Sequence, residues 1–272
     1  MKKGLIIIIA FISILNCYGQ TRDKYFENGL KKQEQQNYAG AILDFTKIIE
    51  SYPDDTAAYL KRGNAKFDLK DYTGAISDYT KAIEINPDNA SGYIYRGIAR
   101  YQLQDYDGTI ADCTKVIEIE PDKETGYDLR ARAKNDQQNF KGALEDYTKL
   151  INLNSGNHEY YYNRGILKDN LQDYSGAIKD YIKSIELNPN FEDAYARRGS
   201  SEFNLNDYKG AIADYTKAIE INPENKEYYY KRGIIKKILK DYDGAIADFT
   251  KVIEIYPNYS VAKNEKYLAK RK

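Results

Sequence analysis

The sequence predicts an all-α solenoid in which one helix–turn–helix unit of 34 residues is repeated seven times. Three observations lead to this fold class. The chain aligns with itself at a shift of 34 residues, glycine and proline recur at fixed positions, and apolar residues follow helical spacing within each unit. One such unit cannot bury its apolar faces alone, whereas stacked copies share a continuous core.

The seven units are contiguous, because no residue is inserted or lost between copies. Gly occupies position 19 of every unit, and all six prolines occupy position 32. Positions 4, 17 and 24 hold 17 of the 28 tyrosines, so the repeat also explains the aromatic composition. Residues 260–272 are expected to form a short capping helix with a basic tail. The units span 22–55, 56–89, 90–123, 124–157, 158–191, 192–225 and 226–259.

Each unit is predicted to contain a helix A and a helix B joined by a tight turn. Apolar residues at positions 4, 5, 8 and 12, and then at 20, 21, 24, 27 and 28, form one face of each helix. Asp or Asn at position 16 favours the start of helix B, and proline at position 32 ends the unit. Glycine at position 8 costs about 1 kcal/mol relative to alanine inside a helix. We therefore expect a close helix contact there, opposite the small residues at positions 20 and 27.

The composition excludes several classes of function. The chain has 41 basic and 41 acidic residues, so it lacks the broad basic surface by which proteins bind nucleic acid. One histidine and two cysteines argue against a histidine-built metal site, a disulfide scaffold and a histidine-dependent nucleophile. We therefore expect no cofactor, no metal ion, no nucleic-acid partner and no enzymatic activity.

The first nineteen residues form a separate segment. Two lysines precede an apolar run of 11 residues, Leu5 to Leu15. A membrane-spanning helix needs about 20 residues, so the pattern is typical of a signal peptide, 1–19, cut after Gly19. Cys17 leaves a second interpretation open, a lipoprotein signal that ends before an acylated Cys17 and anchors the protein to a membrane. Both interpretations predict an exported bacterial protein, in the periplasm or cell envelope or secreted, without a membrane span.

Charged residues recur at positions 7, 23, 26 and 29, which are mostly Arg, Asp, Lys and Glu. Position 23 is Asp and position 26 is Lys in all seven units. One interpretation is a charged binding surface that follows the repeat. The favoured interpretation is i,i+3 pairs and bridges between helices that fix the stacking, because a ligand seldom repeats with its scaffold.

The period of 34, with Gly at position 8, Ala at position 20, an aromatic residue at position 24 and Pro at position 32, resembles the tetratricopeptide repeat (TPR) family. The resemblance covers residues 22–259. It departs from the family pattern at position 4, where Tyr replaces Trp, and at position 7, where Arg replaces Leu. It implies a right-handed α–α solenoid of seven TPR repeats that acts as a binding scaffold, with helix A lining a concave groove.

The resemblance also implies that positions 2, 5, 9 and 12 of helix A face this groove. Their largely apolar and aromatic character suits an extended segment or a helix of a protein partner, and argues against a clamp for a terminal carboxylate. Packing between helices is the alternative for some of these side chains. The groove candidates are Phe26, Leu30, Leu60, Asn64, Phe67, Ile94, Ile98, Tyr101, Asp128, Arg132, Tyr162, Ile166, Tyr230 and Ile234.

The favoured function is a non-enzymatic protein–protein interaction scaffold or adaptor in the bacterial cell envelope. The alternative is a structural solenoid spacer that self-associates without a groove ligand. Mutation of the groove is expected to abolish the first activity and to spare the second.

The fourth unit departs most from the repeat, with Ala131 at position 8, Gln137 at position 14 and Ser155 at position 32. Asp128 and Arg132 also place charge at groove positions. This unit is either a polar recognition point or flexible joint, or a copy that has drifted. Drift is favoured, because repeat arrays tolerate imperfect units.

Two residues with reactive side chains receive structural interpretations. Cys113 replaces the position-24 aromatic residue in the third unit and is expected to be a small buried hydrophobe. His158 stands at position 1 of the fifth unit and is expected to be exposed near a helix start, where a lone histidine gives weak support for chemistry.

Overall fold

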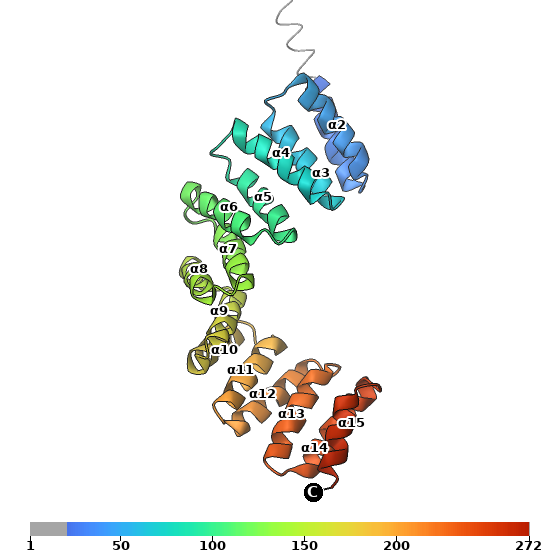
Figure 1. Ribbon diagram of the computed structural model, residues 1–272, viewed down its shortest axis with the longest axis vertical. Coiled ribbons are helices and arrows are strands. Elements are labelled where there is room, and N and C mark those ends of the chain that lie inside the picture. The colour runs from blue at the N-terminus through green and yellow to red at the C-terminus, as the bar shows by residue number, and fades with distance from the viewer. Residues whose placement is uncertain (1–20, 272) are drawn as a thin grey trace, which may run out of the picture. The chain divides into compact units, whose positions relative to one another are not determined.

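The computed structural model describes residues 21–271 (Figure 1). The predicted signal peptide 1–19, with Cys17, lies outside the described residues, as does Lys272. Between residues 21 and 271 every regular element is a helix, beginning with a helical segment at 21–34. The further helices are α2 (Tyr38–Ser51), α3 (Thr56–Asp68), α4 (Tyr72–Ile85), α5 (Ala90–Gln102), α6 (Tyr106–Ile119), α7 (Glu124–Asp136), α8 (Phe140–Leu153), α9 (His158–Asn170), α10 (Tyr174–Leu187), α11 (Glu192–Asn204), α12 (Tyr208–Ile221), α13 (Lys226–Ile238), α14 (Tyr242–Ile255) and α15 (Ser260–Ala269).

The helices alternate in the order that the repeat predicts. Helices α3 to α13 with odd numbers begin at position 1 of a unit, and helices α2 to α14 with even numbers begin at position 17. Within each compact unit, successive helices pack against one another, and the A helices of neighbouring repeats also contact, as α3 and α5 do. The predicted all-α fold of stacked helix–turn–helix repeats is confirmed. Helix α15 packs on α14 in the place of a further helix A.

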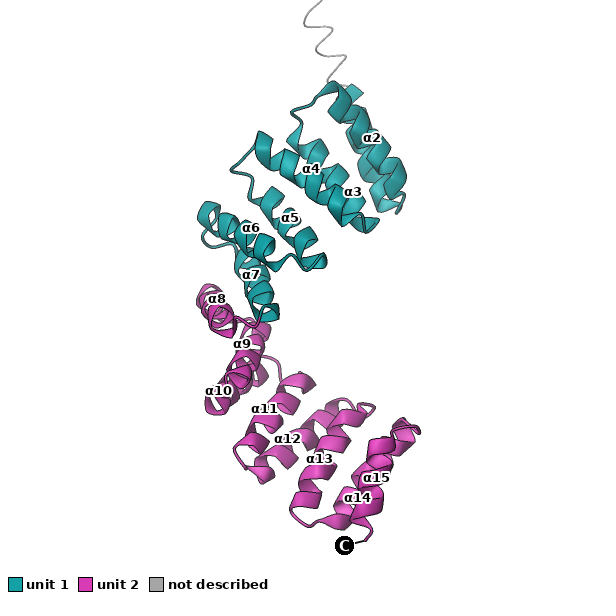
Figure 2. Ribbon diagram, viewed as in Figure 1, with its two compact units in different colours: residues 1–137 teal, residues 138–272 magenta. Residues whose placement is uncertain are grey.

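The chain divides into two compact units, residues 1–137 and 138–272 (Figure 2). The first unit contains the helical segment 21–34 and α2 to α7, and the second contains α8 to α15. The division lies between helix A and helix B of the fourth repeat, the repeat whose sequence departs most from the others. The other six repeats therefore each lie within one unit.

A capped turn joins helix A to helix B in every repeat. The position-16 side chain accepts a hydrogen bond from the position-19 amide, as Asp71 Oδ1 does from Gly74 at 2.9 Å. A Cβ on Gly74 would lie 2.1 Å from the Asp71 carboxylate, so glycine leaves room for the cap. The predicted start of helix B is confirmed. Position 15 adopts a positive φ of 58° to 65° without being glycine, at Gln36, Lys70, Gln104, Gln138, Gln172, Asn206 and Lys240.

Glycine at position 8 lets an aromatic ring of helix B contact helix A. A Cβ on Gly63 would lie 2.5 Å from the ring of Tyr79. The sequence predicts this close approach, but in the first, second, fifth and seventh repeats the nearest partner is the ring at position 24 and not the small residues at positions 20 and 27. In the sixth repeat, the position-20 residue does approach, because a Cβ on Gly199 would lie 3.3 Å from the Ala211 carbonyl oxygen. In the third repeat Cys113 replaces the ring, and the nearest atom to a Cβ on Gly97 would be 3.4 Å away.

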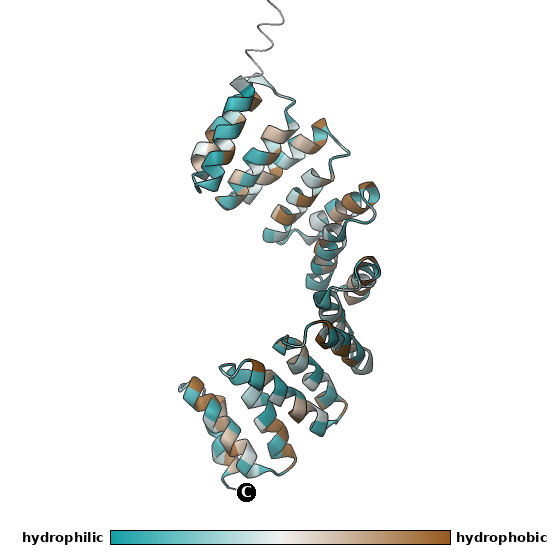
Figure 3. Cartoon of the chain, turned by 180° about the vertical axis from the view of Figure 1, so that it is seen from behind, coloured by the Kyte–Doolittle hydropathy of each residue, from teal (hydrophilic) through white to brown (hydrophobic). Residues whose placement is uncertain are grey.

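The core lies between consecutive repeats. Phe45 and Ile48 of α2 are buried together with Ala58 and Ala65 of α3, so helix B of one repeat packs on helix A of the next. Figure 3 shows hydrophobic residues distributed over many helices of both units. Among the helices within residues 21–271, none has the length and apolar character needed to cross a membrane.

Candidate functional site

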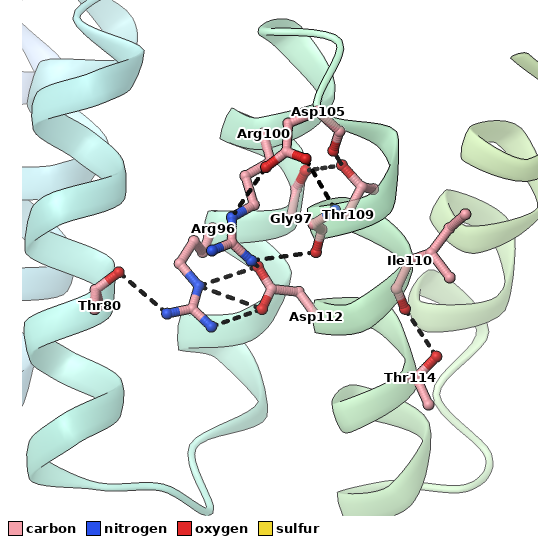
Figure 4. Close-up of polar contacts among 10 residues, drawn as sticks. Thr80, Arg96, Gly97, Arg100, Asp105, Thr109, Ile110, Asp112 and Thr114 are labelled. Atoms are coloured by element: carbon pink, nitrogen blue, oxygen red, sulfur yellow. Dashed lines mark hydrogen bonds and ion pairs between the residues drawn. The ribbon is translucent and has the colours of Figure 1, made fainter. Parts of the chain in front are cut away.

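An arginine at position 7 joins three helices. In the third repeat, Arg96 Nε and Nη2 donate to the Asp112 carboxylate at 3.0 and 2.7 Å, and Nη1 donates to Thr80 Oγ1 at 3.1 Å (Figure 4). Arg100 Nη1 donates to the same carboxylate at 2.8 Å. Asp112 is 2% exposed, and an unpaired buried carboxylate would be costly. We name this set the arginine bridge: the position-7 arginine, the position-23 aspartate of its repeat and the position-25 threonine of the preceding repeat.

The arginine bridge recurs in the second, fifth and seventh repeats, around Arg62, Arg164 and Arg232. The position-7 guanidinium also lies over the position-4 tyrosine ring, 5.5 to 5.8 Å from its centroid. Exposed i,i+3 pairs join positions 26 and 29, as in Lys81–Glu84 at 3.1 Å. These contacts confirm the structural interpretation of the repeated charges. The Tyr at position 4 and the Arg at position 7, which replace the Trp and Leu of the family pattern, therefore contact each other.

The bridge of the sixth repeat lacks its threonine, and a charge beside it is reversed. Ile182 stands at position 25 of the preceding, fifth repeat, where the other repeats have threonine, and Glu202 stands at position 11 of the sixth, where the other repeats have Lys or Arg. Arg198 still donates to Asp214, at 2.7 and 2.6 Å. The second charged group beside Asp214 is now a carboxylate whose Oε2 is buried. Burial, and then repulsion by Asp214, raises the pKa of Glu202 to about 7.

A pocket of about 500 Å³ lies on the face formed by the A helices of the first three repeats, which we name the repeat-2 pocket. The buried Tyr79 forms its floor, and the Tyr79 hydroxyl donates to Asn64 Oδ1 at 2.8 Å. The Phe67 ring packs edge-on against Tyr72, with centroids 5.1 Å apart. Burial raises the pKa of the Tyr79 hydroxyl, so the hydroxyl keeps its proton and remains a donor. The other walls come from Leu30, Gln33, Glu34, Lys61, Asp68, Tyr95 and Ile98.

A second pocket, of about 330 Å³, lies on the A helices of the sixth and seventh repeats, and we name it the repeat-6 pocket. Tyr215 forms its floor and shares a hydrogen bond with Ser200 at 2.7 Å. Phe203 packs on Tyr208 with centroids 5.6 Å apart. The polar residue at position 9, the phenylalanine at position 12 and the tyrosine at position 24 match those of the repeat-2 pocket. The two compact units, 1–137 and 138–272, therefore each contain one of two related pockets. Further lining residues are Asn204, Tyr230, Lys231, Ile234 and Ile235.

The predicted groove residues divide into those that line a pocket and those that do not. Thirteen of the fourteen are half-buried, and Arg132 is exposed. The two pockets bring together six of them: Leu30, Asn64, Phe67, Ile98, Tyr230 and Ile234. Among the rest, Phe26 packs on Phe45 with centroids 5.7 Å apart, and Tyr162 packs on Tyr181 at 6.0 Å. These two contacts fit the alternative of packing between helices, whereas a binding role for the candidates stays a prediction.

The charged candidates of the fourth repeat contact their own chain. Arg132 Nη1 lies 3.9 Å from an Asp128 carboxylate oxygen, and its guanidinium lies 5.4 Å from the centroid of Tyr101. The Tyr101 hydroxyl donates to Asp136. Burial, and then this hydrogen bond, raises the pKa of Tyr101 to about 12. The polar groups at this point therefore already interact with each other.

Several pocket residues were not among the candidates. Ser200 and Phe203 occupy the positions of Asn64 and Phe67, so comparison of the two repeats would have found them. Lys61 and Lys231 share position 6, which the resemblance did not assign to the groove.

The remaining reactive side chains are parts of the scaffold. His158 is half-buried, which corrects the expectation of exposure: Asn188 Nδ2 lies 3.3 Å from His158 Nε2, and the ring packs on Phe191 with centroids 4.9 Å apart. Cys113 is 1% exposed, as expected for a small buried hydrophobe. Within residues 21–271, no group of three or more His, Cys, Asp or Glu side chains is placed to hold a metal ion.

The stacked repeats define the class of protein as an α-solenoid, and family models identify the repeat. The tetratricopeptide repeat model matches residues 158–191, 192–225 and 227–259, and a second TPR repeat model matches residues 63–104. Together these matches cover more than half of the chain. The chain belongs to the TPR family. A search of curated proteins finds no match.

Solved structures of TPR proteins share the fold. A tetratricopeptide repeat protein from Parabacteroides merdae is 18% identical, with a TM-score of 0.66 over 92% of this chain and 99% of that one. The C-terminal part of a TPR repeat-containing protein from Cytophaga hutchinsonii is 19% identical, with a TM-score of 0.78 over 88% and 98%. YrrB, described as a TPR protein with an unusual peptide-binding site, is 22% identical, with a TM-score of 0.59 over 70% and 97%.

Proposed function

We propose that this protein is a non-enzymatic protein–protein interaction scaffold that binds an extended segment or a helix of a partner on its A-helix face. One observation carries the proposal: residues at positions 9, 12 and 24 form a pocket with an aromatic floor in each of the two compact units. One pocket lies around Phe67 and the other around Phe203. Pockets of this kind suit the apolar side chains of a peptide laid across successive helices. The peptide-binding site described for YrrB supports the same use of the fold.

A scaffold role also fits the chemistry of the charged side chains. The position-23 carboxylates are bound by arginine and lysine side chains of helix A, and the lysines at position 26 pair with glutamates at position 29. Groups held in ion pairs on a repeated framework stabilise stacking and are poorly placed to transfer protons to a substrate.

We also propose that the protein acts outside the cytoplasm, in the periplasm or cell envelope of a bacterium. The support is the signal-like segment 1–19, with its basic start and 11-residue apolar run. Mass spectrometry of the purified protein distinguishes cleavage after Gly19 from acylation of Cys17. An intact Met1 in the cell fraction where the protein accumulates would contradict export.

The binding proposal is tested by crosslinking capture from envelope extracts with the full chain. The pocket variant carries Phe67→Ala and Phe203→Ala. The control variant carries Leu69→Ala and Leu205→Ala, which remove exposed leucines at position 14, outside both pockets. We expect the parent and the control to capture the same proteins and the pocket variant to lose them. Capture of the same set by a folded pocket variant would show that the pockets are not the functional surface.

Self-association as a spacer is the alternative function, and the first repeat bears on it. Ala58 and Ala65 are buried at positions 3 and 10 of the second repeat, but Lys24 and Lys31 occupy these positions in the first repeat and are exposed. A charged terminal face is typical of capping and does not favour end-to-end stacking. Sedimentation of the parent and the pocket variant tests the alternative: a concentration-dependent mass that both share would favour it.

A further inference from the structure

The two pockets share an apolar floor but differ in the charges that line them. The repeat-2 pocket is lined by the carboxylates of Glu34 and Asp68 and by the ammonium group of Lys61. The repeat-6 pocket is lined by Lys231, and Asn204 stands at the position of Asp68. The formal charge of the lining is therefore −1 in the first pocket and +1 in the second.

These charges are available to a partner. Among residues 21–271, neither Glu34 nor Asp68 has an ion pair, and the same is true of Lys61 and Lys231, whereas the nearby Asp78 is held by Arg62 and Lys66. Partial burial raises the pKa of the largely exposed Asp68, and no ion pair compensates the carboxylate for the water that it has lost. A cation brought by a ligand would supply that compensation.

We propose that the two pockets select different peptide segments: the repeat-2 pocket takes an apolar side chain next to a Lys or Arg, and the repeat-6 pocket takes an apolar side chain next to an Asp or Glu. This inference rests on the proposed function and adds the chemical class of each segment. The apolar side chain contacts the Phe67 or Phe203 ring in each case, and the charge beside it decides which pocket it enters.

The test is a selection of displayed random peptides on two full-length variants that each keep one pocket. Phe203→Ala leaves the repeat-2 pocket intact, and Phe67→Ala leaves the repeat-6 pocket intact. The two substitutions are matched, because both phenylalanines are half-buried at position 12 and pack on a position-17 tyrosine. We expect peptides with an apolar residue beside Lys or Arg on the first variant, and beside Asp or Glu on the second.

Charge reversal then tests whether the pocket carboxylates cause the preference. In the Phe203→Ala chain, Glu34→Lys with Asp68→Lys is expected to weaken the basic peptides about threefold or more at low salt, with a smaller difference at high salt. The reversed chain is expected to select acidic peptides instead. Circular dichroism melting verifies that each variant is folded, since both carboxylates are exposed.

The outcomes separate this inference from the proposed function. If both variants select apolar peptides with no difference in flanking charge, or if reversal leaves the preference unchanged, the charge selection is wrong and the groove scaffold stands. If neither folded variant enriches any peptide over the double Phe67→Ala, Phe203→Ala chain, the pockets do not bind peptides, and both proposals fail.

Discussion

The third and sixth repeats place the same helices around different charges. In the third repeat, Asp112 lies between two arginines, and one of them also reaches Thr80 of the preceding repeat. In the sixth, Asp214 has one arginine, and Glu202 replaces the second cation. The complete arginine bridge is therefore not required at every junction of the array.

The junction before the sixth repeat has other polar contacts on its A-helix side. Ser201 of α11 donates to Asp169 Oδ1 of α9 at 2.6 Å, and the Tyr181 hydroxyl of α10 donates to Asp169 Oδ2 at 2.7 Å. The Ser201 bond joins the fifth and sixth repeats directly. Ile182 on helix B of the fifth repeat cannot accept a hydrogen bond from Arg198. At this junction, the polar contacts between the fifth and sixth repeats are therefore made by the A helices.

The largest expected effect comes from removing the aspartate in both repeats. Asp112→Asn leaves the largely buried Arg96 without its anion and leaves Arg100 only the longer pair with Asp105 at 3.6 Å, so we expect it to lower the free energy of unfolding by about 2–3 kcal/mol. Asp214→Asn relieves the repulsion on Glu202, whose Oε1 already lies 3.9 Å from Arg198 Nε and can serve as its anion, so we expect a loss of about 1 kcal/mol or less. Urea denaturation midpoints of the two variants make the comparison. Equal losses would show that Glu202 does not compete with Asp214.

The next effect concerns Glu202 itself. Its pKa is raised from 4.5 to about 7 in the folded chain, so between these values the folded state binds more protons than the unfolded state. The contribution of protonated Glu202 to the free energy of unfolding is therefore complete below pH 4.5 and is lost as the pH rises through about 7. Glu202→Lys restores the pattern of the other repeats, and we expect it to stabilise the chain by about 2 kcal/mol at alkaline pH.

The matched control for this titration is Glu202→Gln, which removes the carboxylate without adding a cation. We expect it to flatten the pH dependence of the melting temperature between about pH 5 and about pH 8 while gaining less stability than Glu202→Lys. Melting curves of the parent and both variants over this range give the comparison. A parent profile that already matches the Gln variant would mean that Glu202 titrates normally.

A smaller effect is expected at position 25. Ile182→Thr supplies the hydroxyl that Arg198 Nη1 lacks, and Ile182 is 38% exposed, so little apolar burial is lost. We expect a gain of about 0.5–1 kcal/mol from the new hydrogen bond. The reciprocal change, Thr80→Ile, removes the bond to Arg96 and is expected to cost a similar amount. A gain in the first variant without a loss in the second would point to packing instead of hydrogen bonding.

The sequence predicted the repeat, both helices and the helix caps, because each rests on local chemistry that recurs seven times. It also predicted that the repeated charges are structural. It missed the meaning of position 11, although Lys or Arg in six repeats and Glu202 in the sixth are visible in the alignment. Position 11 lies on helix A, and only the fold shows that its side chain lies beside the position-23 carboxylate of helix B, as Lys66 does beside Asp78.

The pockets were less predictable than the fold. Helical periodicity places Leu30, Asn64 and Ile98 on one face, but it does not show that Asn64 binds the Tyr79 hydroxyl and so lies over the pocket floor. Depth depends on the ring at position 24 and on its partner at position 9, which lie on different helices. Candidates such as Phe26 share the periodicity yet pack on a ring of the core.

The smallest difference between the third and sixth repeats is expected in their turns. Gln104 and Asn206 both adopt a positive φ at position 15, 60° and 63°. Asn tolerates this left-handed conformation better than Gln, and glycine adopts it without steric cost but gains freedom in the unfolded chain. We expect Gln104→Gly to stabilise the chain by about 0.5 kcal/mol and Asn206→Gly to have almost no effect. Melting temperatures of the two variants measure the difference. A larger gain from Asn206→Gly would mean that the turn of the sixth repeat, which follows Glu202, is more strained than the turn of the third.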